Sequence, residues 1–549
     1  MSPWSPPGLV KQKTKLIKWP DFSKGCGHFD HVDGGYSVGT NVNTMYGSAI
    51  PGPLESVDRT GIAAGFRVIK KVRHNDVPCL ATTDSTDTKI YRLESAVWAL
   101  KATFSANATD VCTDMVSFTD AAGNSTLIIF FGSAQAFEYS TNDGTGFTTS
   151  IFAGNAKYGN FGLVQSTGLP APRCLYAVNP NMLFYSANMA VGGSPTTSTP
   201  IDTASATDNY FTSLEQDDTG ETLIGMRRAL WTLASDGIVN KLTRDFEDSQ
   251  GDADGQSDRR NFENPQSIEG RIYYPIHGYN IMEYYHGQIT ETIAPRYTDG
   301  RLNGIPRLDL PINAMVSANG WLVVALGSKN TGTLRDMTHA MGGTVLLQNT
   351  FATTSELYAG RYETDAGGKT AWVWHGSFLT CTDPLRYMWF DEDDEYLYLA
   401  SGDAQSSNSQ QERCYFFADN PLLRLTGSAV VLTDGTATIE TGRIMGDDMD
   451  SEYVNLRFHA HRNYRTDGAN ALLLRLYLRN APGRDTAAAY ETVATWNEAQ
   501  GAIQAEEGFA FPSSRTFLCE EWLKFELSGG GTGKFPILRA CELTIADVR

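Results

Sequence analysis

A meander of short strands is the feature that most constrains the fold of this chain. Three strands are predicted in succession at Arg271–Ile276, Asn280–Tyr285 and Gln288–Ile293, and the turn His286–Gly287 joins the last two as a tight hairpin. The first strand is apolar on both faces, which is typical of a strand buried in a core. A sheet of this size cannot bury both of its faces alone, so the fold requires neighbouring sheets of the same kind.

The apolar strand recurs between about Gly65 and Gly427, at intervals of about 40 to 56 residues and a last interval of about 75. Four short strands in each period of about 45 to 50 residues are the pattern of a β-propeller blade. We therefore predict an irregular β-propeller of about seven blades, with Arg271–Ile276 in about the fifth blade and near the axis. A sandwich array is the competing architecture. The seven copies begin at Pro78, Thr126, Met182, Thr222, Arg271, Trp321 and Tyr396.

The composition agrees with an all-β chain. Of 549 residues, 41% are apolar and only 19% are charged, and the chain contains 52 Gly, 24 Tyr and 26 Phe. Frequent turns and aromatic residues are typical of β-proteins, and no long helical periodicity is present. The length is sufficient for two to four domains with large cores.

The strands of the last 120 or so residues are longer and alternate between apolar and polar positions, which predicts a C-terminal antiparallel β-sandwich of jelly-roll type. The chain thus divides into an N-terminal arm and loop-rich strap (1–64), a propeller (65–426) with a long insertion around 327–369, and the sandwich (427–549). The predicted sandwich strands are Thr436–Ile444, Tyr453–His461, Ala471–Leu478, Glu491–Trp496, Trp522–Leu527 and Pro536–Ile545.

Four lysines give this acidic chain a short basic arm, which is either a solvated tail or a segment that docks on an acidic surface, such as that of another copy. The acidic run Asp391–Glu395 is either a solvated edge or a contact for such an arm. We expect no secretory signal and no membrane span, because no run reaches about 18 apolar residues. The interface candidates are Lys11, Lys13, Lys15 and Lys18.

The net charge of −19 predicts a surface that repels nucleic acid and anionic membranes. The eight cysteines form no CxxC pair, and most lie in apolar strands, where cysteine behaves as a small hydrophobic residue. We expect buried free thiols rather than a disulfide framework. The cysteines are Cys26, Cys79, Cys112, Cys174, Cys381, Cys414, Cys519 and Cys541.

One acidic loop has the spacing of oxygen ligands for calcium. Asp248, Asp252, Asp254 and Asp258 alternate with glycines that permit tight turns. The loop lacks the glutamate that closes an EF-hand, and a solvated acidic loop is the alternative. These four residues are the calcium candidates of the sequence.

Two other groups contain metal-binding residue types. The segment Cys26–His31 contains a cysteine, two histidines and an aspartate, and His459 and His461 share one face of a predicted strand. A zinc site needs three or four ligands at a fixed spacing, and neither group has a second cluster to complete it. We expect no cofactor and no resident metal.

No catalytic motif stands out. Glu269, Glu283 and Glu291 lie in predicted strands or hairpins, with nothing that pairs them as the carboxylates of a glycosidase. The sequence contains no GxSxG elbow, phosphate loop or dinucleotide fingerprint. The segment Ser140–Phe147 resembles a degenerate Asp-box, the structural turn motif of sialidase-type propellers. We expect a protein that is not an enzyme.

The order of the parts resembles that of bacteriophage tail and neck structural proteins. In that group a Gly/Asn-rich strap, here Gly34–Gly61 with Gly39–Asn43, precedes the propeller, and the sandwich opens with a strand similar to Ile439–Ile444. The resemblance implies a virion component such as the propeller-bearing nozzle of a short tail, made in the host cytoplasm and located in the tail.

The resemblance also implies the partners. They are further copies of the chain in a cyclic homo-oligomer such as a hexamer, together with other tail or neck proteins. DNA would pass transiently through a negative channel without specific binding. The alternative function is that of a carbohydrate-binding or carbohydrate-active β-propeller protein that recognises host-surface glycans.

Overall fold

The computed structural model describes residues 14–547 with gaps, the longest of which are 247–260, 291–311 and 417–436. Between 446 and 534 it describes strands alone, and of their side chains only those of residues 523–527. Every regular element of the described residues is a β-strand, so the all-β prediction is confirmed. Among the same residues, no helix is long and apolar enough to cross a membrane.

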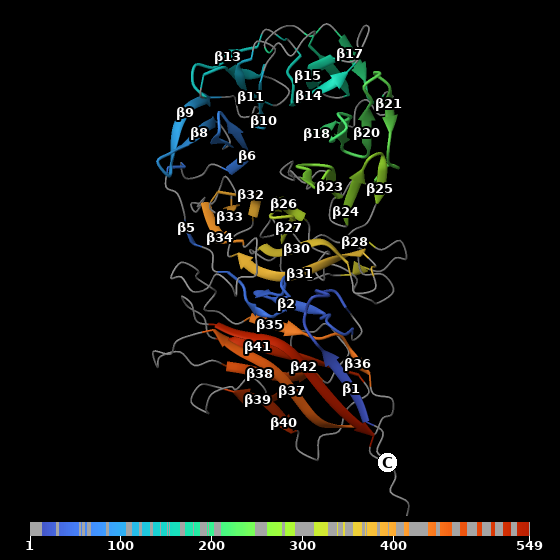
Figure 1. Cartoon of the computed structure of the whole chain (residues 1–549). Coiled ribbons are helices and arrows are strands. Elements are labelled where there is room, and N and C mark those ends of the chain that lie inside the picture. The colour runs from blue at the N-terminus through green and yellow to red at the C-terminus, as the bar shows by residue number, and fades with distance from the viewer. Residues whose placement is uncertain are drawn as a thin grey trace, which may run out of the picture.

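Within the described residues, seven four-stranded antiparallel sheets follow one another along the chain (Figure 1). In each of the first six, neighbouring strands follow in chain order. The first three sheets consist of β6 (Arg67–His74), β7 (Val77–Thr83), β8 (Asp87–Glu94) and β9 (Val97–Ser105); β10 (Cys112–Thr119), β11 (Ser125–Phe131), β12 (Glu138–Ser140) and β13 (Thr148–Thr149); and β14 (Tyr158–Val164), β15 (Ala171–Val178), β16 (Met182–Tyr185) and β17 (Thr197–Pro200).

The next three sheets have the same plan, and a small hairpin interrupts the sixth. They consist of β18 (Phe211–Gln216), β19 (Thr222–Met226), β20 (Leu230–Leu233) and β21 (Val239–Lys241); β22 (Gln266–Ile268), β23 (Arg271–Ile276), β24 (Asn280–Tyr285) and β25 (Gln288–Thr290); and β26 (Ile312–Ala318), β27 (Trp321–Gly327), β30 (Ser355–Thr364) and β31 (Thr370–Cys381), with the hairpin of β28 (Met337–Thr338) and β29 (Thr344–Val345) between β27 and β30.

The seventh sheet combines both parts of the chain. It contains β32 (Leu385–Asp391), β33 (Tyr396–Ser401) and β34 (Gln411–Tyr415), and its outermost strand is β5 (Ser56–Val57), which precedes the first sheet in sequence. The turn after β32 contacts the first sheet, because Asp393 forms an ion pair with Arg73 of β6. Asp393 of the acidic run thus binds an arginine of the same chain.

The seven sheets form a ring with their first strands innermost. Contacts join β6 to β10, β10 to β14, β14 to β18, β22 to β26, β26 to β32, and β32 back to β6. The fourth and fifth sheets share a buried cluster, and Tyr284 donates a hydrogen bond to Asp217 across them at 3.1 Å. Five of the first strands have an irregular register near their start, a repeated bulge that bends each strand.

Two further sheets contain strands from both ends of the chain (Figure 1). The order of one is β1 (Thr14–Trp19), β42 (Phe535–Asp547), β37 (Ser451–Asn463) and β40 (Glu507–Ala510). The order of the other is β2 (Val38–Thr40), β35 (Ala437–Glu440), β41 (Glu520–Ser528), β38 (Leu473–Arg479) and β39 (Glu491–Trp496), with β36 (Ile444–Met445) also paired to β41.

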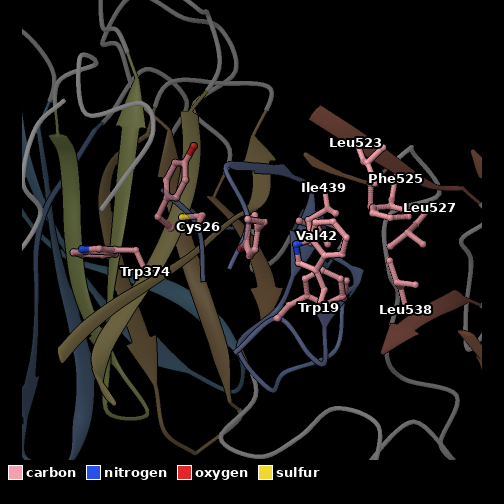
Figure 2. Close-up of a cluster of buried hydrophobic side chains, with 14 of the residues drawn as sticks. Trp19, Cys26, Val42, Trp374, Ile439, Leu523, Phe525, Leu527 and Leu538 are labelled. Carbon is pink, nitrogen blue, oxygen red and sulfur yellow. The ribbon is translucent and has the colours of Figure 1, made fainter. Parts of the chain in front are cut away.

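The described residues of the segment 20–52, which overlaps the strap expected at Gly34–Gly61 and which we call the strap from here on, lie between the sixth sheet and these two C-terminal sheets. The strap contains β2 and the short pair β3 (Val42–Asn43) and β4 (Ile50–Pro51). The Cys26 N–H donates to the Trp374 carbonyl at 2.7 Å, and the Ala49 N–H donates to that of Leu538 at 2.8 Å. One buried cluster therefore includes side chains from the sixth sheet, the strap and both C-terminal sheets (Figure 2).

The structure corrects the expected position of the recurring apolar strand. Arg271–Ile276 lies in the fifth sheet, but it is the second strand, and β22 takes the inner place. Six of the seven recurring apolar strands, this one included, are the second strand of their sheet, whereas Met182 begins the third strand of its sheet. The expected insertion at 327–369 also differs, because β30 inside it is a regular strand of the sixth sheet.

Candidate functional site

A pocket of about 790 Å³ lies where the strap meets the fifth and sixth sheets. We call it the strap pocket. Three parts of the chain far apart in sequence each contribute a wall, so the pocket exists only when the strap is in place. Its principal lining residues are Asp21 and Tyr46 of the strap, Glu269, Arg271 and Tyr273 of the fifth sheet, and Asn319, Arg361, Tyr362, Glu363 and Trp372 of the sixth.

Two hairpin tips place polar groups at the strap pocket. Glu269 and Gly270 have φ of 50° and 75°, and Asn319 and Gly320 have φ of 48° and 76°. Two consecutive residues with positive φ are the type I′ turn, whose twist matches that of the flanking strands. Each tip is therefore fixed by the hairpin to which it belongs.

Arg271 is held rigidly on the fifth-sheet wall. Its Nη1 lies 2.6 Å from Oε1 of Glu283, which is buried, and the guanidinium lies 4.3 Å from the ring centre of Tyr285 and 5.0 Å from that of Tyr362. Burial works against the charge, but the Glu283 carboxylate raises the pKa of Arg271. Burial and Glu283 together raise the pKa of Tyr362 to about 12, so its hydroxyl stays protonated at neutral pH.

Arg361 has a matching arrangement on the sixth-sheet wall. It lies 3.9 Å from the ring centre of Trp321, and its Nη2 is 3.1 Å from Oε1 of Glu363. Burial opposes the charge of Glu363, but the neighbouring His375 and Arg361 lower its pKa. Each arginine of the pocket therefore has its own carboxylate.

His375 lies behind this wall and connects it to the strap. Its side chain is fully buried, with Nδ1 2.9 Å from Oγ1 of Thr44 and Nε2 3.9 Å from Glu363. Thr44 in turn lies 2.7 Å from the hydroxyl of Tyr36, which accepts a hydrogen bond from the Gly376 N–H at 3.1 Å. Burial lowers the pKa of His375, although Glu363 acts in the opposite direction.

His375 is expected to make the stability pH-dependent. Its pKa in the folded state is below the unfolded value of about 6.5, so its contribution is present above that pH and is lost as the pH falls towards the folded pKa, by at most about 1.4 kcal/mol per pH unit. Thermal unfolding of the wild type and of His375→Gln from pH 7.5 to 5.5 measures this contribution. The difference in stability between them should shrink at low pH, and a constant difference would contradict the assignment.

A second group of charges lies at the centre of the ring, on inner strands of four sheets. Lys70 Nζ of β6 is 3.6 Å from Oδ1 of the buried Asp114 of β10, and Glu215 of β18 and Tyr387 of β32 act on the same lysine. Burial raises the pKa of Asp114 against the effect of Lys70, and burial with Asp114 raises that of Glu215. One lysine thus compensates two carboxylates and ties opposite sides of the ring together.

The structure places two of the four candidate interface lysines. Lys11 and Lys13 lie outside the described residues, whereas Lys15 and Lys18 are exposed on β1. Lys18 Nζ is 3.2 Å from Oε1 of Glu542 on β42 of the same chain. The described end of the basic arm therefore pairs with an acidic residue of its own chain.

The structure leaves most of the metal candidates of the sequence untested. Asp248, Asp252, Asp254 and Asp258 lie outside the described residues, and those that are described contain no group of three His, Cys, Asp or Glu side chains suited to a metal ion. In the segment Cys26–His31, Cys26 is a buried thiol. The other free thiols of the described chain are Cys79, Cys112, Cys174, Cys381, Cys414 and Cys541, as expected, whereas Cys519 lies outside it.

Of the three candidate carboxylates, one lines the strap pocket and one lies behind its wall. Glu269 lines it, Glu283 lies behind its wall against Arg271, and Glu291 is outside the described residues. The segment Ser140–Phe147 forms the turn between β12 and β13, where Ser140 Oγ donates to the Thr145 carbonyl at 2.5 Å. That segment has the structural role expected of an Asp-box.

Sequence reasoning missed the sixth-sheet wall. Arg361, Glu363 and Trp372 lie on β30 and β31, but residues up to 369 were expected to form an insertion. The available signal for this wall was the alternation of Trp372 and Trp374 opposite Tyr362. Aromatic residues on alternate positions of paired strands share a face.

No protein-family model matches the sequence, and no curated protein matches it. Among solved structures, the chain is similar to YCF48 from Cyanidioschyzon merolae (10% identity, 66% of this chain and 98% of the other, TM-score 0.39). It is also similar to BBS1N in complex with ARL6DN (10%, 67% and 97%, 0.38) and to an exo-beta-1,3-galactanase from Phanerochaete chrysosporium (7%, 89% and 100%, 0.28). Likenesses at this level carry no argument about function.

Proposed function

We propose that the chain is a seven-bladed β-propeller with a C-terminal β-sandwich and that it serves as a non-enzymatic structural protein of a bacteriophage tail. In this role several copies form a ring as a nozzle or adaptor around the DNA ejection channel. The net charge of −19 suits a channel that repels the DNA backbone. The strap also supports the proposal, because it holds the seven sheets and the C-terminal sheets together through a common core.

The observation that carries the proposal is the surface of β9. This strand is the outermost of the first sheet within the described residues, and its Val97 and Leu100 are 44% and 52% exposed. An edge strand has free backbone groups, and proteins usually cover or charge such edges because they pair with other chains. Exposed apolar side chains on an edge favour contact with a further copy.

Imaging and mass measurement test this proposal. We expect the purified full-length protein to form cyclic rings by negative-stain microscopy and native mass spectrometry, and Val97→Lys/Leu100→Lys to shift it to monomers with an unchanged melting temperature. Thr103→Lys, at an exposed position of the same strand, is the matched control and should leave the ring intact. A wild-type monomer at high concentration, or rings of the double variant, would refute the proposal.

A further inference from the structure

The charges of the strap pocket do not suit an anionic ligand. Arg271 and Arg361 are the cationic side chains of its lining, and each already contacts a carboxylate, Glu283 at 2.6 Å and Glu363 at 3.1 Å. Asp21 and Glu269 add further negative charge to the walls. A phosphate or carboxylate would therefore enter a region with no excess positive charge.

The same lining does not suit a purely apolar ligand either. Charged side chains stand on all three walls, and an apolar ligand would remove their water without replacing its hydrogen bonds. A neutral ligand with many hydroxyl groups suits this mixed lining, because each hydroxyl both donates and accepts hydrogen bonds.

Aromatic rings supply the apolar part of the pocket. Tyr362 and Trp372 meet edge to face, with ring centres 4.8 Å apart and planes at 85°, and Tyr273 lies 5.2 Å from Trp372. Tyr362 and Trp372 are half-buried and line the pocket, so they form a corner of two ring surfaces. The C–H face of a sugar ring packs against such surfaces, while its hydroxyls point to the rim.

The polar groups around this corner are fixed before any ligand arrives. Arg271 packs on the rings of Tyr285 and Tyr362, Arg361 packs on Trp321, and Glu269 is at the tip of a tight hairpin. A guanidinium has five donors, of which the ion pairs use only some. Pre-organised donors lower the entropic cost of binding.

We propose that the strap pocket binds a neutral oligosaccharide, with a sugar ring against Trp372 and Tyr362 and hydroxyls bonded to Arg271, Arg361 and Glu269. The volume of about 790 Å³ is within the range of about 300 to 1,000 Å³ of small-molecule sites and admits a short oligosaccharide. This binding activity goes beyond the proposed structural role and holds whether or not the chain forms a ring.

The test uses full-length protein on a printed array of neutral oligosaccharides of gluco, galacto, manno and N-acetylated types, followed by titration calorimetry with each that binds. Glu269→Asn removes the charge and keeps a residue that tolerates positive φ. Asp76→Asn is the matched control, because Asp76 is an acidic residue at φ 59° on the hairpin tip between β6 and β7, away from the pocket.

We expect the wild type and Asp76→Asn to bind at least one oligosaccharide class equally, and Glu269→Asn and Trp372→Phe to bind it at least 10-fold more weakly with unchanged melting temperatures. No binding by the wild type, binding confined to sulfated or sialylated glycans added as a comparison, or equal binding by all variants would overturn the proposal. If the Trp372→Phe variant is unstable, the oligosaccharide binding of Glu269→Asn alone tests the proposal.

Discussion

A Trp19→Ala variant is expected to lose about 3–5 kcal/mol of stability, because the indole is fully buried and alanine leaves a cavity in its place. Trp19 ends β1, pairs in register with Cys541 and packs in the cluster shared by the strap and the C-terminal sheets (Figure 2). Its loss should therefore weaken both the attachment of β1 and the start of the strap that follows it.

Lys18→Ala on the same strand is the control for this prediction. The Lys18 side chain is half-exposed and its ion pair with Glu542 lies at the surface, where such pairs contribute about 0–1 kcal/mol. Urea unfolding followed by tryptophan fluorescence and by circular dichroism compares the two variants. If the chain unfolds in more than one transition, the shift should fall on the one that involves the C-terminal sheets. Equal losses for both variants would show that the shared core is not what holds β1.

The sequence predicted the second strands of the sheets better than the innermost ones. The apolar runs at Thr126, Thr222 and Trp321 mark second strands, which are covered on both faces. The inner strands carry polar residues towards the centre of the ring, such as Lys70 and Glu215, and so show no apolar run. Periodicity therefore finds the strands between two neighbours and misses those that border the centre.

In the third sheet, the apolar pattern led to the wrong strand being taken as the recurring one. The second strand of this sheet is β15, whose apolar run Cys174–Val178 follows Pro172 and Arg173, but Met182 on the next strand was taken instead. Arg173 is buried and donates to the carbonyls of Val164 and Ser186 at 2.9 and 3.0 Å. A buried arginine that satisfies backbone carbonyls looks like a loop residue until its partners are known.

Pairings between distant segments could not be predicted. Val57 pairs with Glu412, and β2 pairs with β35, across hundreds of residues and with only two or three residues in each N-terminal strand. The strap is rich in glycine and asparagine and was expected to be loop-rich, because its hydrogen bonds go to segments that the local sequence does not reveal.

Part of the strap pocket was within reach of the sequence. In the predicted hairpin, Glu283 lies opposite Tyr273, and Arg271 is the diagonal neighbour on the same face. Opposite charges at such positions pair, so the Arg271–Glu283 contact follows from the hairpin register. The walls from the strap and the sixth sheet do not follow from it, because they depend on where those segments dock.

A Gly25→Ala variant is expected to release the strap from β31 at a cost of about 2–5 kcal/mol, the sum of the strain of an L-residue at positive φ and of overpacking. Gly25 has φ 71°, and a Cβ atom there would fall far inside van der Waals contact with the Trp374 carbonyl oxygen, the acceptor of the Cys26 N–H. The backbone would have to move away, and that hydrogen bond would be lost.

Gly123→Ala separates the two causes. Gly123 has φ 83° but nothing lies within 4 Å of its added Cβ, so this variant should lose only the strain of positive φ, about 1–2 kcal/mol. Chemical unfolding gives both losses, and limited proteolysis should cut the strap of Gly25→Ala much faster than that of Gly123→Ala. Because the strap forms one wall of the strap pocket, Gly25→Ala should also weaken any oligosaccharide binding. Equal stability losses and equal cleavage would mean that the close approach of the strap to β31 does not hold the two parts of the chain together.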